Sequence, residues 1–399
     1  FNPKSFPVEI MSLSEQEGVR LRATISEFGP VLLSRILDLS DAQSGVVSVI
    51  FKYCDDNKLP LLDLKDFKKI LQYATQEGKA EFEDAYGRIS TASTGAILRK
   101  VVEIEQQGGD IFFGEKSFEV EDLVRTTHDG RGDINIIRLT DIQDKPKLFS
   151  TFMLSLLAEI YETFPEQGDN DRPELIMFID EAHLIFNEAS RALLNQIESI
   201  VKLIRSKGLG LYFVTQNPTD VPEAVLSQLG LKVQHALRAF TAKDRKAIKL
   251  TAQNYPDTDY YDTAEVLTSL GIGEALVSAL DEKGRPTPLS ATMMRAPMSR
   301  MDILTDSELN TLLDNSKLVL KYNETIDRES AYEMLNKKIE KAELVKAKEE
   351  AREAKEIERK RSSRSSFSRS STRQNPIVKV LTSATFIRAV FGILKKAMK

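Results

Sequence analysis

Strands alternate with helices through the middle of the chain, and this alternation limits the fold more than any other feature. Short apolar runs of strand type occur at 133–139, 175–180, 209–215 and 231–239, and helical patterns separate them. Two parallel strands need a crossover of a dozen or more residues, whereas a hairpin needs only a short turn. The spacing therefore predicts β-α-β crossovers and an α/β fold, with a mostly parallel sheet that helices cover on both faces.

The pattern changes outside this central stretch and divides the chain into six segments. Before it, PVEIMSL at 7–13 is of strand type, and apolar residues at helical spacing fill 31–56. After it, the runs at 273–278 and 287–294 predict a terminal strand pair, and TDSE at 305–308 predicts a capping box that opens a helix. We expect a leading strand of the sheet at 1–19, a helical subdomain at 20–107, an α/β core at 108–300, C-terminal helices at 301–360, a disordered Arg/Ser linker at 361–376 and a basic amphipathic helix at 377–399.

Charge is divided sharply between the body of the chain and its end. Residues 359–399 hold 11 of the 55 basic residues and no acidic residue, which leaves 44 basic and 60 acidic residues in 1–358, a net charge of −16. Such a body repels a phosphate backbone unless basic side chains gather on one surface. The tail is therefore the cationic part. It would contact nucleic acid, an acidic surface of a neighbouring subunit or, as the less favoured choice, anionic lipid.

Composition excludes several classes of protein. Hydrophobic residues make up 41% of the chain, enough for a sizeable core, and no window approaches the roughly 18 uncharged apolar residues that span a bilayer. The opening FNPKSFPVEI lacks a basic region followed by an apolar one, so we expect neither secretion nor a membrane span. The one cysteine, Cys54, excludes an intrachain disulfide and a multi-cysteine zinc site and fits a reducing, cytoplasmic location.

The segment LIMFIDEAH at 175–183 is the most informative for chemistry. An apolar strand that ends in Asp180 and Glu181 delivers two carboxylates to the edge of a parallel sheet, where ligands bind in open α/β folds. In a nucleotide hydrolase, Asp180 would hold Mg²⁺ through a water and Glu181 would polarise the attacking water. The alternative is a strand that leads into the acidic first turn of a solvated helix.

The next strand ends in polar residues as well. The run at 209–215 ends in Thr215, and Gln216 follows it directly, about thirty residues after the acidic pair. An amide at this position would sense a γ-phosphate or position the lytic water, and the alternative is a simple Gln-Asn-Pro turn. Two arginines, Arg205 in RSKG and Arg238 at the end of LKVQHALR, are candidates for an arginine finger that reaches a neighbouring subunit's nucleotide. Each is otherwise a solvated residue or a partner of a helix dipole.

Two other features argue against alternative sites. The chain contains no G-x-x-x-x-G-K-[ST] run, and its nearest approach, the segment at 109–117, has an extra glutamate before Lys-Ser and no strand ahead of it. The three histidines, His128, His183 and His235, are too scattered for a metal cluster, and we expect His183 to pack beside Glu181. The sequence therefore lacks its own phosphate cradle.

Several long motifs in order resemble one family. LIMFIDEAHLIF, RSKGLGLYFVTQNPTDVPEAVLSQLG, KVQHALRAFTAKDRKAI, GIGEALVSALDEKGRPTP and MMRAPMSRM, with the upstream run at 22–56 and GGDIFFGE, are similar to the bacterial YjgR-type branch of the HerA-like ATPases. The resemblance covers nearly the whole chain. It implies a RecA-like P-loop NTPase fold of the HerA/FtsK group, whose members form hexameric rings and move or unwind double-stranded DNA with ATP and Mg²⁺.

The resemblance also assigns roles to residues. It implies that Asp180 and Glu181 are the Walker B pair, with Asp180 as the metal residue, that Thr215 and Gln216 form the sensor at the next strand, and that Arg205 or Arg238 is the finger acting in trans. It further implies a DNA partner and self-association into a ring. Family members carry the Walker A loop upstream of the point that corresponds to Phe1. Because the chain opens on Phe1 without an initiator methionine, we expect a fragment that is inactive without that segment.

A second hypothesis, from another class of protein, stays open beside the ATPase. A non-catalytic nucleic-acid-binding or scaffold module could keep the RecA-like fold and use the basic tail for contacts. The presence or absence of a G-x-x-x-x-G-K-[ST] run upstream decides most of the question. The DNA partner rests on the resemblance alone, since neither the charge of the body nor its aromatic residues indicate it.

Overall fold

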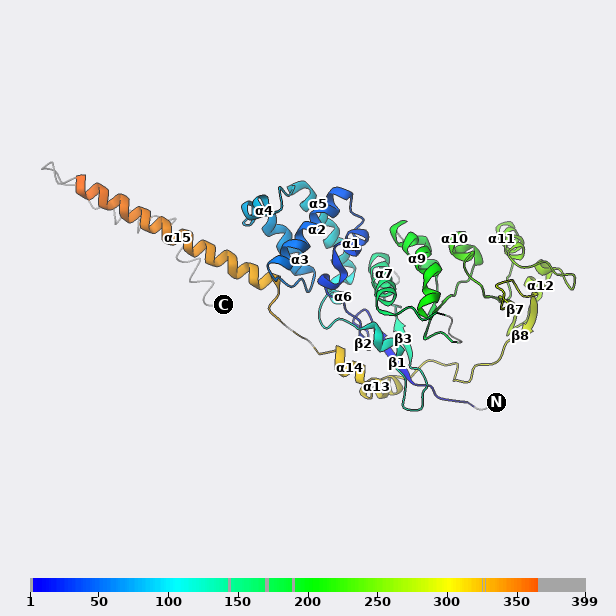
Figure 1. Cartoon of the computed structure of the whole chain (residues 1–399). Coiled ribbons are helices and arrows are strands. Elements are labelled where there is room, and N and C mark those ends of the chain that lie inside the picture. Colours follow the sequence, from blue (N-terminus) through cyan, green and yellow to red (C-terminus); the bar gives the residue numbers. More distant parts are fainter. Residues whose placement is uncertain are drawn as a thin grey trace. The chain divides into compact units, whose positions relative to one another are not determined.

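The computed structural model describes residues 3–142, 145–168, 172–188, 191–324, 326 and 328–364 (Figure 1). The chain divides into two compact units, Phe1–Lys337 and Lys338–Lys399. The predicted helix at 377–399 and residues 365–376 of the predicted linker lie outside the described residues, and 361–364 are the last residues of a long helix. The boundaries of the six expected segments stay predictions.

In the part of the chain that the structure describes, eight strands are distributed over three small sheets. They are β1 (Val8–Ser12), β2 (Val19–Arg20), β3 (Ile134–Arg138), β4 (Leu175–Ile179), β5 (Leu209–Phe213), β6 (Lys232–Gln234), β7 (Glu274–Ser278) and β8 (Ser290–Met293). The helices are α1 (Ile25–Ile36), α2 (Asp41–Asp56), α3 (Leu64–Thr75), α4 (Lys79–Ala85), α5 (Thr91–Ile104), α6 (Asp110–Phe112), α7 (Pro146–Thr163), α8 (His183–Glu188), α9 (Arg191–Leu203), α10 (Glu223–Leu226), α11 (Ala242–Gln253), α12 (Thr263–Ser269), α13 (Asp306–Asp314), α14 (Lys317–Tyr322) and α15 (Ala331–Arg364). The other helical turns among the described residues are η1 (Glu105–Gly109), of π type, and η2 (Val120–Val124), η3 (Ile204–Lys207) and η4 (Pro218–Asp220), of 3-10 type.

Parallel pairing dominates the part of the chain that the alternation pattern predicted. β1 pairs in parallel with β2 and with β3, and β4 pairs in parallel with β5 from Leu175↔Leu209 to Ile179↔Phe213. The predicted α/β class is therefore confirmed, as are the predicted strands at 7–13, 133–139, 175–180 and 209–215. Because β4 and β5 run in the same direction, their carboxyl ends meet at one edge.

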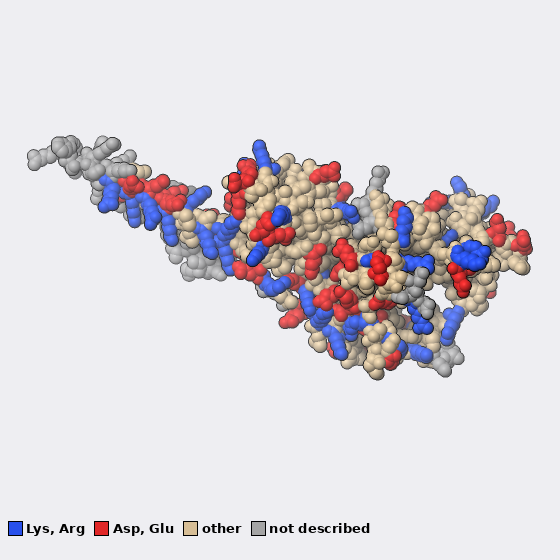
Figure 2. Space-filling view, viewed as in Figure 1, with Lys and Arg blue, Asp and Glu red and all other residues tan. Residues whose placement is uncertain are grey.

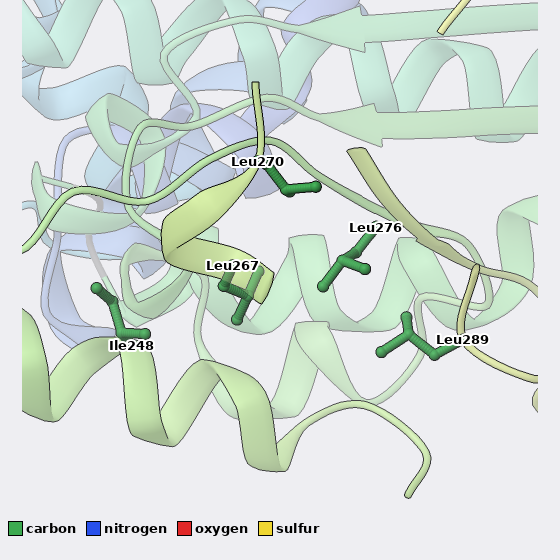
Figure 3. Close-up of a cluster of buried hydrophobic side chains, with 5 residues drawn as sticks. All are labelled: Ile248, Leu267, Leu270, Leu276 and Leu289. Carbon is green, nitrogen blue, oxygen red and sulfur yellow. The ribbon is translucent and has the colours of Figure 1, made fainter. Parts of the chain in front are cut away.

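The last three strands form an antiparallel sheet instead. β7 lies between β6 and β8, so the predicted terminal strand pair is confirmed. The strand predicted at 231–239 is shorter than expected, because the backbone leaves the sheet after Gln234 and the Leu237 amide donates to the Leu267 carbonyl at 2.9 Å. Five side chains come together between α11, α12 and this sheet in a small core of its own (Figure 3): Ile248, Leu267, Leu270, Leu276 and Leu289.

Helices α1–α5 gather in a separate bundle in the amino-terminal part of the chain (Figure 1). Its core contains Tyr53 stacked on Phe82, with ring centroids 4.2 Å apart, and both side chains are buried. The fully buried carboxylate of Asp66 ties a later segment to this bundle, because it accepts hydrogen bonds from the Ser330 hydroxyl at 2.5 Å and the Tyr332 amide at 2.8 Å. The start of α15 is thereby fixed on α3.

The segment that follows the antiparallel sheet returns to the first strands. The Ser316 hydroxyl donates to the buried Glu9 carboxylate at 2.6 Å, and the Asn323 amide donates to the Gly18 carbonyl at 2.9 Å. Tyr322 is fully buried, and its hydroxyl donates to Asp122 at 2.5 Å. These bonds hold α13 and α14 against β1, β2 and η2. The capping box predicted at 305–308 is confirmed, with Thr305 and Glu308 bonding reciprocally.

Helix α7 connects β3 to β4 and is buried over most of its surface. Leu148, Leu154, Leu157 and Ile160 are each at most 2% exposed. Glu159 lies on this helix, and burial, followed by the charges of nearby carboxylates that include Glu27 and Glu121, raises its pKa to about 7. The chain therefore keeps a half-buried carboxyl group that resists ionisation.

Replacing Glu159 with glutamine should stabilise the protein at high pH only. In the unfolded chain this carboxyl ionises near its ordinary pKa of 4.5, whereas in the folded chain it holds its proton to about pH 7. The free energy of unfolding therefore falls as the pH rises from 4.5 to about 7. Above pH 7 it stays lower than at pH 4 by roughly 1–3 kcal/mol. Urea denaturation should show Glu159→Gln to be more stable than the wild type at pH 8 and equal to it at pH 4.

A matched control for this experiment is Glu77→Gln, because Glu77 is an exposed carboxylate. Its substitution should change the free energy of unfolding by the same small amount at both pH values. An effect of Glu159→Gln that is equally independent of pH would contradict the account.

Candidate functional site at the carboxyl ends of β4 and β5

A tight turn follows β4 and places the two acidic residues at the edge of the sheet. Ile179 is buried, Asp180 is exposed, and the backbone of Glu181 adopts φ of +47°, a left-handed conformation that costs a residue with a side chain about 1 kcal/mol. The ladder continues past the strands and holds this turn, since the Val214 amide donates to the Ile179 carbonyl and the Ala182 amide to the Val214 carbonyl, each at 2.9 Å. Backbone strain of this kind concentrates at functional sites.

The carboxylate of Glu181 has one hydrogen-bond partner and one further close neighbour, and its buried Oε2 accepts no hydrogen bond among the described residues. Its Oε1 accepts a hydrogen bond from Gln216 Nε2 at 3.0 Å, and its Oε2 lies 3.1 Å from His183 Nδ1. Gln216 lies three residues after the end of β5, and the parallel register of β4 and β5 brings its side-chain amide to the Glu181 carboxylate. The prediction that His183 packs beside Glu181 is confirmed. A fixed carboxylate with restricted exposure is suited to accept a proton or to orient a water.

The neighbouring polar residues have different surroundings. The exposed carboxylate of Asp180 accepts a hydrogen bond from the Glu181 amide through Oδ1, at 2.9 Å. The Thr215 hydroxyl donates to Asp220 at 3.2 Å, and Asn217 accepts a bond from the Thr219 amide at 3.4 Å. The Gln-Asn-Pro turn therefore exists and presents Gln216 to Glu181, while Thr215 is engaged with Asp220 inside that turn.

Arg205 does not join this cluster within one chain. It lies in η3, just before β5 begins at Leu209, and is exposed. Since β5 is five residues long, Arg205 stands at the opposite edge of the sheet from Gln216, roughly 16 Å or more away at about 3.3 Å per residue. Its side chain is thus on the far side of the β4–β5 pair from Glu181.

Arg238 is engaged in a structural contact. Its guanidinium donates to the Thr268 carbonyl at 2.5 Å and to the Leu270 carbonyl at 3.1 Å. These carbonyls stand at the carboxyl end of α12, where the last acceptors of a helix have no partner within it. Arg238 therefore caps α12.

The segment at 109–117 does not form a phosphate-binding loop. Helix α5 runs directly into η1 and α6, so helix and not a strand precedes it. Gly109 is buried, and a Cβ at this position would meet Ile104 at 2.5 Å. Among the residues that the structure describes, no group of three or more His, Cys, Asp and Glu residues could hold a metal ion, and no helix is long and apolar enough to cross a membrane.

A cavity lies beside the acidic turn, and nothing in the sequence indicates it. It has a volume of about 850 Å³ and is lined by residues 123–126, by β3, by α7 and by the whole of β4 as far as Glu181. The apolar runs at 133–139 and 175–180 predicted strands but not that a space separates them, because pairing between strands is a long-range property. The sequence shows these two apolar runs, but nothing in it indicates which strand pairs with either of them.

The fold and this edge together define a parallel α/β protein with an acidic site at its strand ends. A family model described as "Helicase HerA-like C-terminal" matches residues 1–396. The chain therefore belongs to the HerA-like helicase family, in agreement with the resemblance seen in its motifs. The narrower YjgR-type branch stays a prediction.

Two curated relatives illustrate the match. The chain is 27% identical over 150 residues to the "DNA double-strand break repair helicase HerA" of Saccharolobus solfataricus, which covers 37% of this chain and 29% of the relative. It is 30% identical over 154 residues to the "Probable helicase MJECL08" of Methanocaldococcus jannaschii, which covers 36% and 28%. The matched region thus spans less than a third of the length of these archaeal relatives.

Solved structures resemble the chain more remotely. The plasmid coupling protein TrwB in complex with a non-hydrolysable GTP analogue aligns with a TM-score of 0.49 at 12% identity, covering 74% of this chain and 76% of that one. The genome packaging NTPase B204 from Sulfolobus turreted icosahedral virus 2 aligns with a TM-score of 0.28 at 15% identity, covering 46% and 75%.

The two candidate arginines should differ in their effect on stability. Arg238→Ala removes two donors from the end of α12 and should lower the free energy of unfolding by about 1 kcal/mol. Arg205→Ala removes an exposed side chain and should change it by less than about 0.5 kcal/mol. Urea denaturation of both variants at neutral pH measures the difference, and equal effects would contradict the capping role of Arg238.

Proposed function

We propose that this chain is part of the ATP-hydrolysing motor core of a HerA-like DNA helicase or translocase. The observation that supports it is the Glu181 carboxylate, hydrogen-bonded by Gln216 and close to His183, at the carboxyl edge of two parallel strands. Ligands of open α/β sheets bind at this edge. The motif order of the sequence and membership of the HerA-like family favour nucleotide hydrolysis there.

Each residue of the edge has a defined part in this proposal. Glu181 accepts a hydrogen bond from the attacking water and orients it toward the γ-phosphate. The Gln216 amide fixes that carboxylate and senses the phosphate, and Thr215 supports the turn that presents Gln216. In phosphoryl transfer the protein contributes mainly position and charge, so a carboxylate that the Gln216 amide fixes suits the task.

Asp180 is the residue that would hold Mg²⁺. Its carboxylate is exposed, with Oδ1 bonded to the Glu181 amide. Mg²⁺ is usually bound through one or two carboxylates together with waters and substrate phosphates, so a single exposed carboxylate fits this ion better than a closed cluster of ligands would. When bound, Mg²⁺ neutralises phosphate charge.

The phosphate cradle itself must come from elsewhere, because these 399 residues contain no G-x-x-x-x-G-K-[ST] run. In our proposal it lies on the segment expected upstream of Phe1, and the chain alone is inactive or binds nucleotide weakly. The missing run is also what favours the second candidate, a non-catalytic nucleic-acid-binding or scaffold module of the same fold. Measurable ATP hydrolysis by a polypeptide that includes the upstream segment would favour the motor core over the non-catalytic module.

DNA as the partner and a hexameric ring as the assembly complete the proposal. The HerA relative is by its name a DNA helicase. On the face shown in Figure 2, basic and acidic side chains are interspersed over the body, so that face offers no single basic surface for DNA. Arg205, exposed at the far edge of the sheet, is better placed than Arg238 to reach a neighbouring subunit. The single buried thiol, Cys54, fits a cytoplasmic location.

The proposal predicts that Glu181→Gln removes hydrolysis but keeps binding. In the polypeptide that includes the upstream segment, Mg²⁺-dependent ATP hydrolysis should fall at least about 100-fold, because the amide cannot polarise the water. The affinity for ATP should change little. Phosphate release with and without duplex DNA measures the first quantity, and equilibrium binding of a fluorescent ATP analogue measures the second.

The matched control is Glu282→Gln, an exposed carboxylate in the turn between β7 and β8. It should hydrolyse ATP at the wild-type rate. Full activity of Glu181→Gln would refute the role of Glu181, and the absence of hydrolysis in the longer wild-type polypeptide would favour the non-catalytic module.

A further inference from the structure

A second cavity lies where the first strands, the helical bundle and the start of α15 meet. It has a volume of about 470 Å³ and shares no lining residue with the cavity beside the acidic turn. Charged side chains make up most of its lining. We propose that it binds a phosphate group, free or as the monoester of a small molecule, between the side chains of Arg20 and Arg22.

The two arginines lie two positions apart on one stretch of chain. Arg20 ends β2, and three residues later a bridge pairs Ala23 with Phe113. Alternate residues of an extended chain point to the same face, and Arg20 and Arg22 both line the cavity. The Arg20 amide donates to the Asn323 side chain at 2.9 Å, so the backbone that carries the pair is fixed.

Neither guanidinium has a carboxylate partner among the residues that the structure describes. Arg22 Nη1 donates to the Glu115 carbonyl at 2.6 Å, and the Arg20 guanidinium makes no hydrogen bond or ion pair in that part of the chain. Both side chains are half-buried, and burial, followed by the charge of Arg20, lowers the pKa of Arg22. Two partly desolvated cations that repel each other are stabilised when an anion lies between them.

Other charged groups of the cavity are already paired. Arg328 donates two hydrogen bonds to the Glu115 carboxylate, and Lys65 pairs with Glu333 at 3.3 Å. Asp63 caps the amino-terminal end of α3. These groups are satisfied by one another or by the backbone, so none of them compensates the charge of the two arginines.

Two further carboxylates at the cavity limit the kind of ligand. Glu15 and Asp110 are exposed and make no hydrogen bond or ion pair with the described residues, and water keeps them solvated. They repel an extended polyanion such as a nucleic-acid backbone, but they can accept hydrogen bonds from hydroxyl or amino groups of a small ligand. The charges therefore favour a small phosphate-bearing molecule over DNA.

Phosphate matches the arginine pair better than a carboxylate does. A phosphate group carries nearly two negative charges and three acceptor oxygens, so it can accept from two planar guanidinium forks at once. A carboxylate has one charge and two oxygens, which one fork satisfies. The cavity also lies where β1 and β2 end in parallel, the edge at which open α/β sheets bind ligands, and its volume is within the range of small-molecule sites.

Isothermal titration calorimetry of the 399-residue chain in a phosphate-free buffer tests the site. The probes are inorganic phosphate, glycerol 3-phosphate, glycerol and a short duplex DNA. The variants are Arg20→Gln and Arg22→Gln, and the matched control is Arg99→Gln, which replaces an exposed arginine of α5 outside the cavity.

We expect a phosphate probe to bind saturably, with an affinity at least about tenfold lower in Arg20→Gln and in Arg22→Gln and unchanged in Arg99→Gln. Tighter binding of glycerol 3-phosphate than of inorganic phosphate identifies a phosphate ester as the ligand, and the reverse order identifies free phosphate. Glycerol should not bind.

Three results would overturn the proposal. They are the absence of saturable binding of either phosphate probe, an affinity that Arg20→Gln leaves unchanged, and binding of duplex DNA that is tighter than that of both phosphate probes and is lost in Arg20→Gln. Circular dichroism checks the fold of each variant. Should Arg22→Gln fail to fold, Arg20→Gln alone decides, because the Arg20 guanidinium holds no described residue in place. The titrations contain no ATP, so their result is independent of the proposed function.

Discussion

Parallel pairing of β4 with β5 is the constraint on which the rest of the site depends. The register from Leu175↔Leu209 to Ile179↔Phe213 ends both strands at one edge, and the ladder continues through Val214 and Ala182. Only because of this register does Gln216 reach Glu181, 35 residues earlier in the chain, at 3.0 Å. A shift of one residue would turn every side chain of the strand to the other face.

The remainder of the described chain supports this pair from one side only. Helix α7 packs beside β4 and β3, and the segment with α13 and α14 returns to hold β1 and β2. The opposite face of β4 and β5 keeps Ile176, Phe178 and Tyr212 exposed. The acidic edge is thus built, although the sheet that carries it keeps large hydrophobic side chains exposed on this face.

Local signals in the sequence predicted much of this structure. Apolar runs located β1, β3, β4 and β5, and Glu181 and Gln216 were predicted at the ends of neighbouring strands, but the hydrogen bond between them comes from the structure. The sequence could not show that Arg238 caps α12, that β6 ends at Gln234, or that β3 and β4 stand apart. Each of these depends on contacts between residues distant in the chain, which local periodicity does not record.

The central claim is that Glu181 and Gln216 act as one unit on ATP, and a double-mutant cycle tests it most directly. Turnover numbers would be measured for Glu181→Gln, Gln216→Ala and the double variant in the polypeptide that includes the upstream segment. If the amide works by holding the carboxylate, the double variant should be no slower than Glu181→Gln alone. Losses that multiply would show that the two residues act independently and would contradict the account.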